Sequence, residues 1–521
     1  MPETFYITTA IAYPNGRPHI GHAYEAIAAD AIARFQRMQG RDVHFVTGTD
    51  EHGLKMAQTA RVAGRDTLEF ATEISNYFRE MCAKLDISID AFCRTTEERH
   101  HEASVAIWKA MEAAGDLYLD RYEGWYSVRD EAYYDASELV DGEGEQRLSP
   151  QGTPVEWTAE ETWFFRLSKY REFLIELNET PGFLEPESRR NEILSFLKGN
   201  VLRDLSVSRT SFDWGVPVPG SPGHVMYVWV DALTTYLTGI GFPERGGKFG
   251  RFWPADLHLI GKDITRFHTV YWPAFLKSAD LPVPKAVFSH GFLLARGGEK
   301  MSKSLGNVVD PLELAERFGV DQLRYFLLRE VSFGQDGTYS AEAIVTRCNA
   351  ELANSFGNLA QRTLSLIFKN CDAYLPQVYG HDPADAELFA LLERVMTKEI
   401  PKAFERLALS QAIEHWMGAV FACNAYIDAQ APWALRMTDP ERMQTVLATL
   451  YIAIAQLAVG IASVIPQASG RLLDAMGIAC ELRDFKGIQS HWYSSLAEAD
   501  FRLEQPVGLF PRLELPAEEE A

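Results

Sequence analysis

The sequence lacks several features that would place it in a special class of protein. Its 521 residues include only six cysteines, none of them spaced as a C-x-x-C pair, so neither a zinc knuckle nor a disulfide framework is expected. No apolar run of about 18 residues is free of polar interruption, which predicts no membrane span. The amino terminus has no basic or Arg- and Ser-rich leader. We therefore expect a cytoplasmic protein with free thiols.

Basic side chains are also scarce. The chain has 50 Lys and Arg against 72 Asp and Glu, a net charge of −22. This charge argues against broad basic contacts with nucleic acid or anionic lipid. It leaves room for a local basic surface, because screening makes distant exposed charges nearly independent. The hydrophobic share of 47% is that of a globular protein, and the length predicts about three domains.

The first 115 residues show an alternating strand and helix pattern. Residues 5–13 are β-branched and aromatic, which predicts a strand, and 43–47 predict a second one. Between them, apolar residues from Tyr24 to Phe35 recur at helical spacing until Gly40. Strand, helix and strand in this order predict a βαβ unit and hence a Rossmann-like α/β domain with a parallel sheet.

The pattern changes twice along the rest of the chain. Residues 116–224 are rich in aromatics and acidic runs, and we expect them to form a connective insertion on the sheet domain. Strand patterns then resume at 225–230, 257–260 and 286–289. From about residue 340 only helical spacing is found, which predicts an α-helical bundle with breaks at Pro401, Pro432, Pro440 and Pro466. The predicted boundaries are 1–115 and 225–325 for the two halves of the α/β domain, 116–224 for the insertion, 326–515 for the helical region and 516–521 for an acidic tail.

The first chemical motif is His19-Ile20-Gly21-His22, at the start of the first helix. In a parallel sheet, ligands bind beyond the carboxyl ends of the strands, and a helix start there attracts anions. Gly21 leaves space for a flat group, and the two histidines can donate hydrogen bonds to phosphate oxygens. For an isolated pattern of this kind, helix-capping or core histidines are the more common explanation.

The second motif is Lys300-Met301-Ser302-Lys303-Ser304, which follows two glycines. Its two cations and two hydroxyls suit a triphosphate, because phosphoryl and nucleotidyl transfer need charge neutralised in the transition state. An exposed basic turn is the ordinary alternative for two lysines at this spacing. The complete five-residue string is far more specific than the lysines alone.

Together, and about 280 residues apart, the two strings resemble the class I aminoacyl-tRNA synthetases, and the likeness narrows to the methionyl-tRNA synthetase family. The resemblance covers nearly the whole chain. The segments that are similar to that family are 9–22, 48–53, 204–215, 227–236, 260–273, 300–307, 354–362 and 424–433.

The resemblance implies a ligase that attaches L-methionine to its tRNA through a methionyl-adenylate, with release of pyrophosphate and AMP. The methionine carboxylate is already a nucleophile, so the first step needs charge neutralisation rather than a general base. The catalytic residues implied are His19, His22, Lys300 and Lys303. The ATP-binding residues implied are Gly21, Gly261, Asp263, His290, Gly291, Met301, Ser302 and Ser304, with Mg²⁺ arriving on ATP.

The resemblance also implies a methionine pocket. Asp50 would pair with the α-ammonium group, and aromatic side chains would contact the thioether. From the residues alone, Trp229 and Tyr236 fit core positions better than a pocket. The implied pocket residues are Ala10, Ile11, Tyr13, Asp50, Trp229, Ala232, Leu233, Tyr236, Ile264 and His268.

In the helical region the resemblance implies anticodon recognition by Asn358, Arg362 and Trp433, within a stem-contact region and anticodon-binding domain over 326–515. A tryptophan can stack on an unpaired base, although a buried core tryptophan is an equal alternative from the sequence. The implied partners are initiator and elongator tRNA(Met), and we expect a basic stripe for them on the acidic surface. Many family members carry zinc knuckles in the insertion, but 116–224 contain no cysteine, so we expect no structural zinc. We also expect a monomer, because no further tRNA-binding domain follows residue 515.

Two other functions stay open at this point. Another class I synthetase for an apolar amino acid, such as leucine or cysteine, would share both strings but not the combination around Trp229 and His268. A non-catalytic tRNA-binding relative is a third possibility, but such proteins usually lose the strings that this chain keeps.

Overall fold

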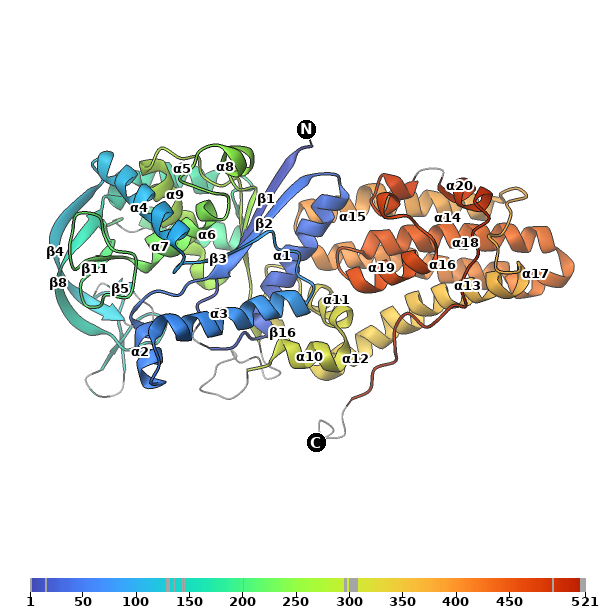
Figure 1. The fold of residues 1–521 in the computed structure, drawn as a ribbon, viewed down its shortest axis with the longest axis horizontal. Coiled ribbons are helices and arrows are strands. Elements are labelled where there is room, and N and C mark those ends of the chain that lie inside the picture. The colour runs from blue at the N-terminus through green and yellow to red at the C-terminus, as the bar shows by residue number, and fades with distance from the viewer. Residues whose placement is uncertain are drawn as a thin grey trace.

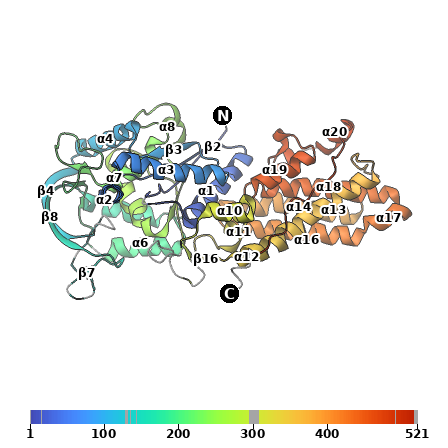
Figure 2. The same cartoon turned by 60° about the horizontal axis from the view of Figure 1, so that its bottom comes forward.

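The protein, seen here as a computed structural model, is elongated, with a sheet-containing part at one end and a helical part at the other (Figure 1). A second view shows the same two parts arranged end to end along the long axis (Figure 2). The structure describes residues 2–14, 16–127, 132–134, 136–142, 144, 146–199, 201–294, 298, 308–489 and 492–515. The predicted acidic tail, 516–521, lies outside these ranges.

A six-stranded, all-parallel sheet forms the centre of the first part, which confirms the predicted Rossmann-like α/β class. The chain order along the sheet reverses between β1 and its neighbour β13, and this reversal opens a crevice at the carboxyl ends of the strands. Across the sheet the strands are β3 (Ala91–Arg94), β2 (Asp42–Thr49), β1 (Thr4–Thr9), β13 (Leu257–Gly261), β14 (Val287–His290) and β9 (Leu184–Glu185).

Helices cover both faces of this sheet, and the period-two alternation of β1 separates two cores. Phe5 and Ile7 belong to the core on the side of α1 (Ile20–Met38), whereas Tyr6 belongs to the core on the opposite side. The other helices of this part are α2 (Leu54–Val62), α3 (Thr67–Lys84), α4 (Glu98–Ala113), α7 (Val228–Thr238), α8 (Gly247–Phe252) and α9 (Trp272–Ser278).

The strand predicted over 225–230 is wrong for most of its length. Only β12 (Val225–Met226) is extended, and α7 begins at Val228. The Tyr227 carbonyl accepts the backbone N–H groups of Val230 and Asp231, which closes the first turn of the helix. The β-branched and aromatic residues here are buried on several sides by tertiary packing, which overrides their preference for strands.

The insertion forms a separate antiparallel sheet at the end of the molecule away from the helical part (Figures 1 and 2). Its predicted range, 116–224, also contains β9, which pairs with β14 in the main sheet, so the two units interlock at this strand. The insertion sheet contains β4 (Leu117–Ser127), β5 (Ala132–Tyr134), β8 (Glu156–Phe165) and β10 (Leu205–Ser206). Two strand pairs, β6 (Val140–Asp141) with β7 (Arg147–Leu148) and β11 (Ser208–Arg209) with β12, and two helices, α5 (Arg171–Glu179) and α6 (Glu187–Gly199), complete this region.

The second part is helical, as predicted. Pro432, Pro440 and Pro466 each begin a helix, where a missing N–H costs nothing. Pro401 does not separate two helices as predicted, because a π-helical turn, Val395–Glu399, carries the chain into α15 without a gap. The helices are α10 (Pro311–Phe318), α11 (Val320–Glu330), α12 (Ala341–Arg347), α13 (Asn358–Asn370), α14 (Pro383–Arg394), α15 (Ile400–Glu405), α16 (Leu409–Gln430), α17 (Pro432–Thr438), α18 (Pro440–Ile461), α19 (Pro466–Ala475) and α20 (Trp492–Glu498).

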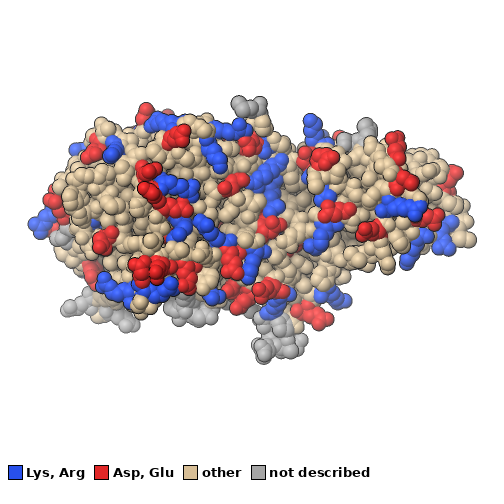
Figure 3. Space-filling model, viewed as in Figure 1, with Lys and Arg blue, Asp and Glu red and all other residues tan. Residues whose placement is uncertain are grey.

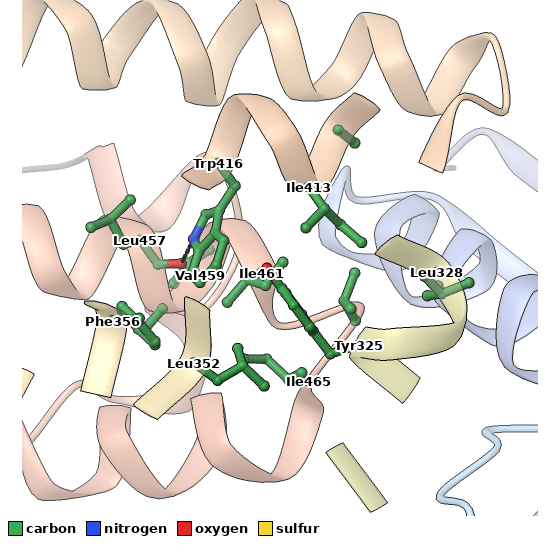
Figure 4. Packing of buried hydrophobic residues seen from close by; sticks show 14 of the residues in the cluster. Tyr325, Leu328, Leu352, Phe356, Ile413, Trp416, Leu457, Val459, Ile461 and Ile465 are labelled. Carbon is green, nitrogen blue, oxygen red and sulfur yellow. Dashed lines mark hydrogen bonds between the residues drawn. The ribbon is translucent and has the colours of Figure 1, made fainter. Parts of the chain in front are cut away.

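The core of this part continues into α11, which lies next to α1 of the sheet-containing part. In Figure 4 the Trp416 indole and the Tyr325 ring pack among aliphatic side chains, and Trp416 Nε1 donates to the Leu457 carbonyl at 2.9 Å. Among the described residues, α18 is long and apolar enough to cross a membrane by length and composition. Because 83% of its apolar 18-residue stretch is buried inside the protein, it is a core helix.

Charges of both signs are mixed on the surface. On the face shown in Figure 3, Lys and Arg side chains lie among Asp and Glu over both parts of the molecule. Among the residues described on this face, the expected basic stripe for tRNA is not seen.

A buried ion pair joins the two parts of the molecule. Arg324 of α11 and Asp30 of α1 are both fully buried, with Nη2 2.6 Å from Oδ2. The same guanidinium donates to the carbonyls of Ser463 and Val464, which follow α18, and of Leu85, which follows α3. Burial opposes ionisation of Asp30, but Arg324, Arg34 and Ser88 outweigh it and lower its pKa. The carboxylate is therefore ionised where it meets Arg324.

Replacing Asp30 by asparagine is expected to destabilise the protein strongly. The substitution leaves the Arg324 guanidinium buried without its counter-charge, which costs about 3–5 kcal/mol. The measurement is the urea-induced unfolding midpoint, followed by circular dichroism. The control is Glu192→Gln, which removes an exposed pair with Arg189 and should change stability by no more than about 0.5 kcal/mol. Equal midpoints for the two variants would show that the buried pair is not needed.

Candidate functional site

A cavity of about 510 Å³ opens at the carboxyl edge of the sheet, where the strand order reverses. Thr9 and Ala10 at the end of β1 lie on one side of it, and Gly261 at the end of β13 lies on the other. From the insertion, Tyr134 and Gln151 also reach its lining. This is the position at which open α/β sheets bind ligands.

Most of the residues predicted for the site meet in this cavity, although they come from distant parts of the chain. The predicted residues that line it are Ala10, Ile11, Tyr13, His19, Gly21, His22, Asp50, Trp229, Gly261, Asp263, Ile264, His290 and Gly291.

The two histidines of the first motif cap the amino terminus of α1 and also line the cavity. The Nδ1 atom of His19 accepts the Gly21 N–H, and that of His22 accepts the His19 N–H, both at 3.1 Å. Because both Nδ1 atoms are acceptors, the ring proton of each histidine is on Nε2, which therefore is a donor. The capping alternative and the phosphate-binding prediction are thus compatible, since capping fixes the tautomer that can donate to an anion.

A glycine is needed at position 21 for a structural reason in addition to the predicted one. A Cβ at this position would lie 2.9 Å from Cε1 of His19. The glycine therefore makes room for the capping ring as well as for a ligand.

All five residues of the second motif lie outside the described residues, namely Lys300, Met301, Ser302, Lys303 and Ser304. The described chain on either side of it is attached at the cavity. Before it, β15 (Leu293–Leu294) pairs with β16 (Gly337–Thr338), and Leu293 lines the cavity. After it, the Val309 carbonyl accepts the N–H of Ile20 at 3.0 Å, next to His19. Leu293 and Val309, which flank the second motif in the sequence, therefore lie at the cavity and next to the first motif, respectively.

Sequence reasoning missed one carboxylate, Glu25, which lines the cavity one helical turn after His22. Its Oε2 lies 2.8 Å from Nε2 of His290, whose Nδ1 lies 2.8 Å from the Gly291 carbonyl. A carbonyl can only accept, so the ring donates from Nδ1. Burial raises the pKa of Glu25, although His290 partly offsets this effect. Burial also opposes the charged form of His290, but Glu25 outweighs it and raises the pKa of the imidazole.

The i, i+3 spacing of His22 and Glu25 on an amphipathic helix was the signal that could have identified Glu25.

The segment after β14 is fixed closely against the chain near residue 336. The Asp336 carboxylate accepts the Lys262 ammonium at 2.8 Å and the Phe292 N–H at 2.8 Å. Gly291 is required here, because a Cβ would lie 2.3 Å from the backbone of Gln335. Gly261, Asp263 and His290 are thereby held on one side of the cavity.

Asp50 and Trp229 also line the cavity. Asp50 follows β2, is 9% exposed, and donates its N–H to the Ala12 carbonyl at 2.9 Å. The half-buried Trp229 ring stacks on Phe267 with centroids 3.8 Å apart. A carboxylate next to an aromatic surface suits a cationic group attached to an apolar side chain.

Four of the predicted pocket residues do not reach the cavity, namely Ala232, Leu233, Tyr236 and His268. All four are buried, and the His268 ring lies edge-on to Trp229. Nδ1 of His268 lies 3.0 Å from the Ile264 carbonyl and Nε2 lies 2.7 Å from the Tyr236 hydroxyl. Burial lowers the pKa of His268 to about 4. The ring is therefore neutral at pH 7, donates to Ile264 and accepts from Tyr236.

The three residues predicted to read the anticodon lie together in the helical part. Asn358 and Arg362 are one turn apart on α13, and the Arg362 guanidinium lies 5.4 Å from the centre of the Trp433 ring. Trp433 is 47% exposed in the first turn of α17, which excludes the buried-core alternative. Figures 1 and 2 show α17 at the end of the helical part, far from the sheet.

No group of three or more His, Cys, Asp or Glu side chains among the described residues is arranged to hold a metal ion. All six cysteines are free, and four of them are buried.

Comparison with known proteins gives consistent results over the whole chain. Residues 5–364 match the family "tRNA synthetases class I (M)", and residues 375–514 match the "Anticodon binding domain of methionyl tRNA ligase". The methionine--tRNA ligase of Brucella suis is 54% identical over 512 residues, with 98% of each chain covered. The corresponding ligase of Mycobacterium bovis is 53% identical over 527 residues, with 99% of each chain covered. A solved structure of Mycobacterium tuberculosis methionyl-tRNA synthetase in complex with methionyl-adenylate superposes with a TM-score of 0.93 at 51% identity, covering 98% of this chain and 100% of that one.

Proposed function

Because the chain belongs to the class I methionyl-tRNA synthetase family, we propose that it attaches L-methionine to tRNA in an ATP-dependent reaction through a methionyl-adenylate. The observation that carries this function is the identity of 54% to a methionine--tRNA ligase over 98% of both chains. The cavity supports it independently, since it brings a cation-binding side and an anion-binding helix start together.

The methionine binds on the side of Asp50 and Trp229. Asp50 pairs with the α-ammonium group, because a buried carboxylate gains most from a charged donor. Trp229 and the lining residues Ala10, Ile11, Tyr13 and Ile264 surround the side chain. Ala232, Leu233, Tyr236 and His268 act from buried positions outside the cavity lining. Since Tyr236 and His268 are neutral and hydrogen-bonded to each other, they add no charge that would favour a polar side chain.

The ATP binds on the side of α1, β13 and β14. His19 and His22 donate from Nε2 to phosphate oxygens, and the Asp263 carboxylate accepts from ribose hydroxyls. His290 and Gly291 lie beside the adenine, with Glu25 holding the His290 ring. A methionine carboxylate oxygen attacks the α-phosphorus, the bond to the bridging oxygen of pyrophosphate breaks, and no proton is transferred.

Magnesium fits this site as a companion of ATP. The described residues offer isolated carboxylates at the cavity rather than a cage of ligands, which suits an ion held mainly by phosphate oxygens. When bound, Mg²⁺ neutralises phosphate charge. Asp263 is the carboxylate that would help to hold this ion, since it lines the cavity on the proposed nucleotide side. The absence of structural zinc remains a prediction.

The tRNA contacts both ends of the molecule. Trp433 offers an exposed ring for stacking on an anticodon base, and Asn358 and Arg362 offer hydrogen-bond groups beside it. Both initiator and elongator tRNA(Met) are the proposed substrates. The free cysteines are consistent with a reducing, cytoplasmic location. The monomeric state remains a prediction that sedimentation tests.

Amino-acid-dependent exchange of pyrophosphate into ATP tests the proposed function. We expect rapid exchange with methionine and exchange at least about tenfold slower with leucine or cysteine at equal concentration, because a mismatched side chain costs about 1–3 kcal/mol in an apolar pocket. Exchange with leucine or cysteine and none with methionine would contradict the proposal. No exchange with any amino acid would favour a non-catalytic tRNA-binding protein.

A further inference from the structure

A buried carboxylate, Asp231, lies behind the cavity between two histidines. Its Oδ2 is 2.6 Å from Nδ1 of His52, and its Oδ1 is 2.6 Å from Nε2 of His100. Asp231 is 1% exposed, and the two histidines are 4% and 0% exposed. None of the three lines the cavity, so the reaction described above does not use them directly.

The three residues come from three different segments. Asp231 is in the first turn of α7, His52 is in the turn after β2, and His100 is in α4. Burial opposes ionisation of Asp231, but the charges and hydrogen bonds of His52 and His100 outweigh it and lower its pKa. Asp231 is therefore ionised and accepts from both rings.

On the α4 side, further contacts hold the carboxylate in place. Nδ1 of His100 lies 2.9 Å from the Thr238 hydroxyl on the last turn of α7, and the Ser104 hydroxyl lies 3.1 Å from its Nε2. His100 thus contacts both ends of α7.

On the side of the turn, Trp214 fixes the chain around His52. The Trp214 Nε1 donates to the Glu51 carbonyl at 2.6 Å, the Trp214 carbonyl accepts the Gly53 N–H at 3.1 Å, and its ring lies edge-on to His52. The hydrogen bond between His52 and Asp231 links this turn, which also carries Asp50, to α7.

This link joins the two elements on which the proposed methionine site depends. Trp229 and the buried residues at i+3, i+4 and i+7 from it share one face of α7. Asp231 projects from a different face, toward the turn. Asp50, which faces the ammonium group, precedes His52 by two residues. The Asp231 carboxylate therefore joins the helix that carries Trp229 to the turn that carries Asp50.

We propose that Asp231 is a positioning residue for methionine. Its carboxylate holds α7 and the turn that carries Asp50 at the separation that the amino acid requires. This inference rests on the proposed function, because it assumes that methionine occupies the space between Asp50 and Trp229. The hydrogen bonds of Asp231, His52 and His100 connect α4, α7 and the turn after β2, whereas the proposed nucleotide residues are on α1, β13 and β14, so we expect ATP binding to change little.

The test is Asp231→Asn, measured by equilibrium binding of methionine alone and of ATP alone. The amide keeps the size but presents an N–H group to one of the two donor rings, so one hydrogen bond is lost and α7 can shift relative to the turn. We expect methionine binding to weaken about tenfold or more, because small misplacements in a binding site have effects of this size. The affinity for ATP should stay within about twofold, because substitutions at independent sites affect each other by no more than about this factor.

The matched control is Asp116→Asn. Asp116 is also a fully buried carboxylate with several partners, Lys169, Tyr170 and Ser278, but it lies at the junction with the insertion and does not line the cavity. This variant should bind methionine and ATP like the unmodified protein. Should Asp231→Asn not fold, His52→Gln breaks the link from the other side, and the same selective loss of methionine binding is expected.

Two results would overturn the inference. Unchanged methionine binding in a folded variant would show that the link does not position the site. Equal weakening of methionine and ATP binding would show general structural damage instead of positioning. Failure of the unmodified protein to bind methionine would contradict the proposed function itself, and the unmodified protein is measured alongside for that reason.

Discussion

Replacing Lys303 by alanine is expected to slow adenylate formation by about 10²–10³-fold, while methionine binding changes little. The magnitude is that of removing one group that stabilises charge in a transition state. Lys303 lies outside the described residues, and its role is a proposal from the second motif. The structure supports the proposal through the flanking chain, since Leu293 of β15 lines the cavity and the Val309 carbonyl accepts the N–H of Ile20, next to His19.

The measurement for Lys303→Ala is the single-turnover rate of adenylate formation, together with equilibrium binding of methionine. Lys277→Ala is the matched control, because Lys277 is an exposed lysine on α9 that packs against Phe173 and does not line the cavity. This control should react at the unmodified rate. An unchanged rate in Lys303→Ala would remove Lys303 from the mechanism.

Replacing Asp50 by asparagine is expected to weaken methionine binding by at least about 30-fold. Removing one partner of a buried, hydrogen-bonded charge pair costs about 2–5 kcal/mol, and about 1.4 kcal/mol corresponds to a factor of ten. Asp50 is 9% exposed at the cavity wall, so little water replaces the lost charge. The KM for methionine in the exchange assay measures this effect.

A second carboxylate in the same cavity gives the control for Asp50. Asp263 lines the nucleotide side, so Asp263→Asn should raise the KM for ATP and leave that for methionine within about twofold, as expected for independent sites. We therefore expect Asp50→Asn to raise mainly the KM for methionine and Asp263→Asn to raise mainly the KM for ATP. Equal effects of both substitutions on both substrates would contradict the division of the cavity into an amino-acid side and a nucleotide side.

The sheet domain could be predicted from local pattern because its strands are short and regular. The alternation of Phe5, Tyr6 and Ile7 between two cores is a property of any strand with two covered faces. The start of α7 could not be predicted in this way, since residues 225–230 have the composition of a strand and only tertiary packing makes them helical. Pro401 was misjudged for a related reason, because a π-helical turn absorbs it.

The site divides in the same manner. Residues within the two strings were identified because their spacing is local, and the structure brings the described ones to one cavity. Glu25 and Asp231 were missed because their meaning depends on partners far away in sequence, His290 in one case and His52 with His100 in the other. The helical spacing could have placed Glu25 on the face of His22, but a single sequence contains no sign of the distant pairings themselves. The residue pattern alone favoured a core position for Tyr236, which is buried, whereas the contact of His268 with Trp229 depends on three-dimensional packing.

The central claim is that two clusters of side chains, His19 with His22 and Lys300 with Lys303, surround one bound nucleotide. The most direct test is a crystal structure of the protein with methionine and a non-hydrolysable ATP analogue. The account predicts a triphosphate at the amino terminus of α1, with phosphate oxygens within hydrogen-bond distance of both histidine Nε2 atoms and of at least one of the two lysines. A nucleotide bound away from the α1 terminus, or one contacted by neither lysine, would contradict it.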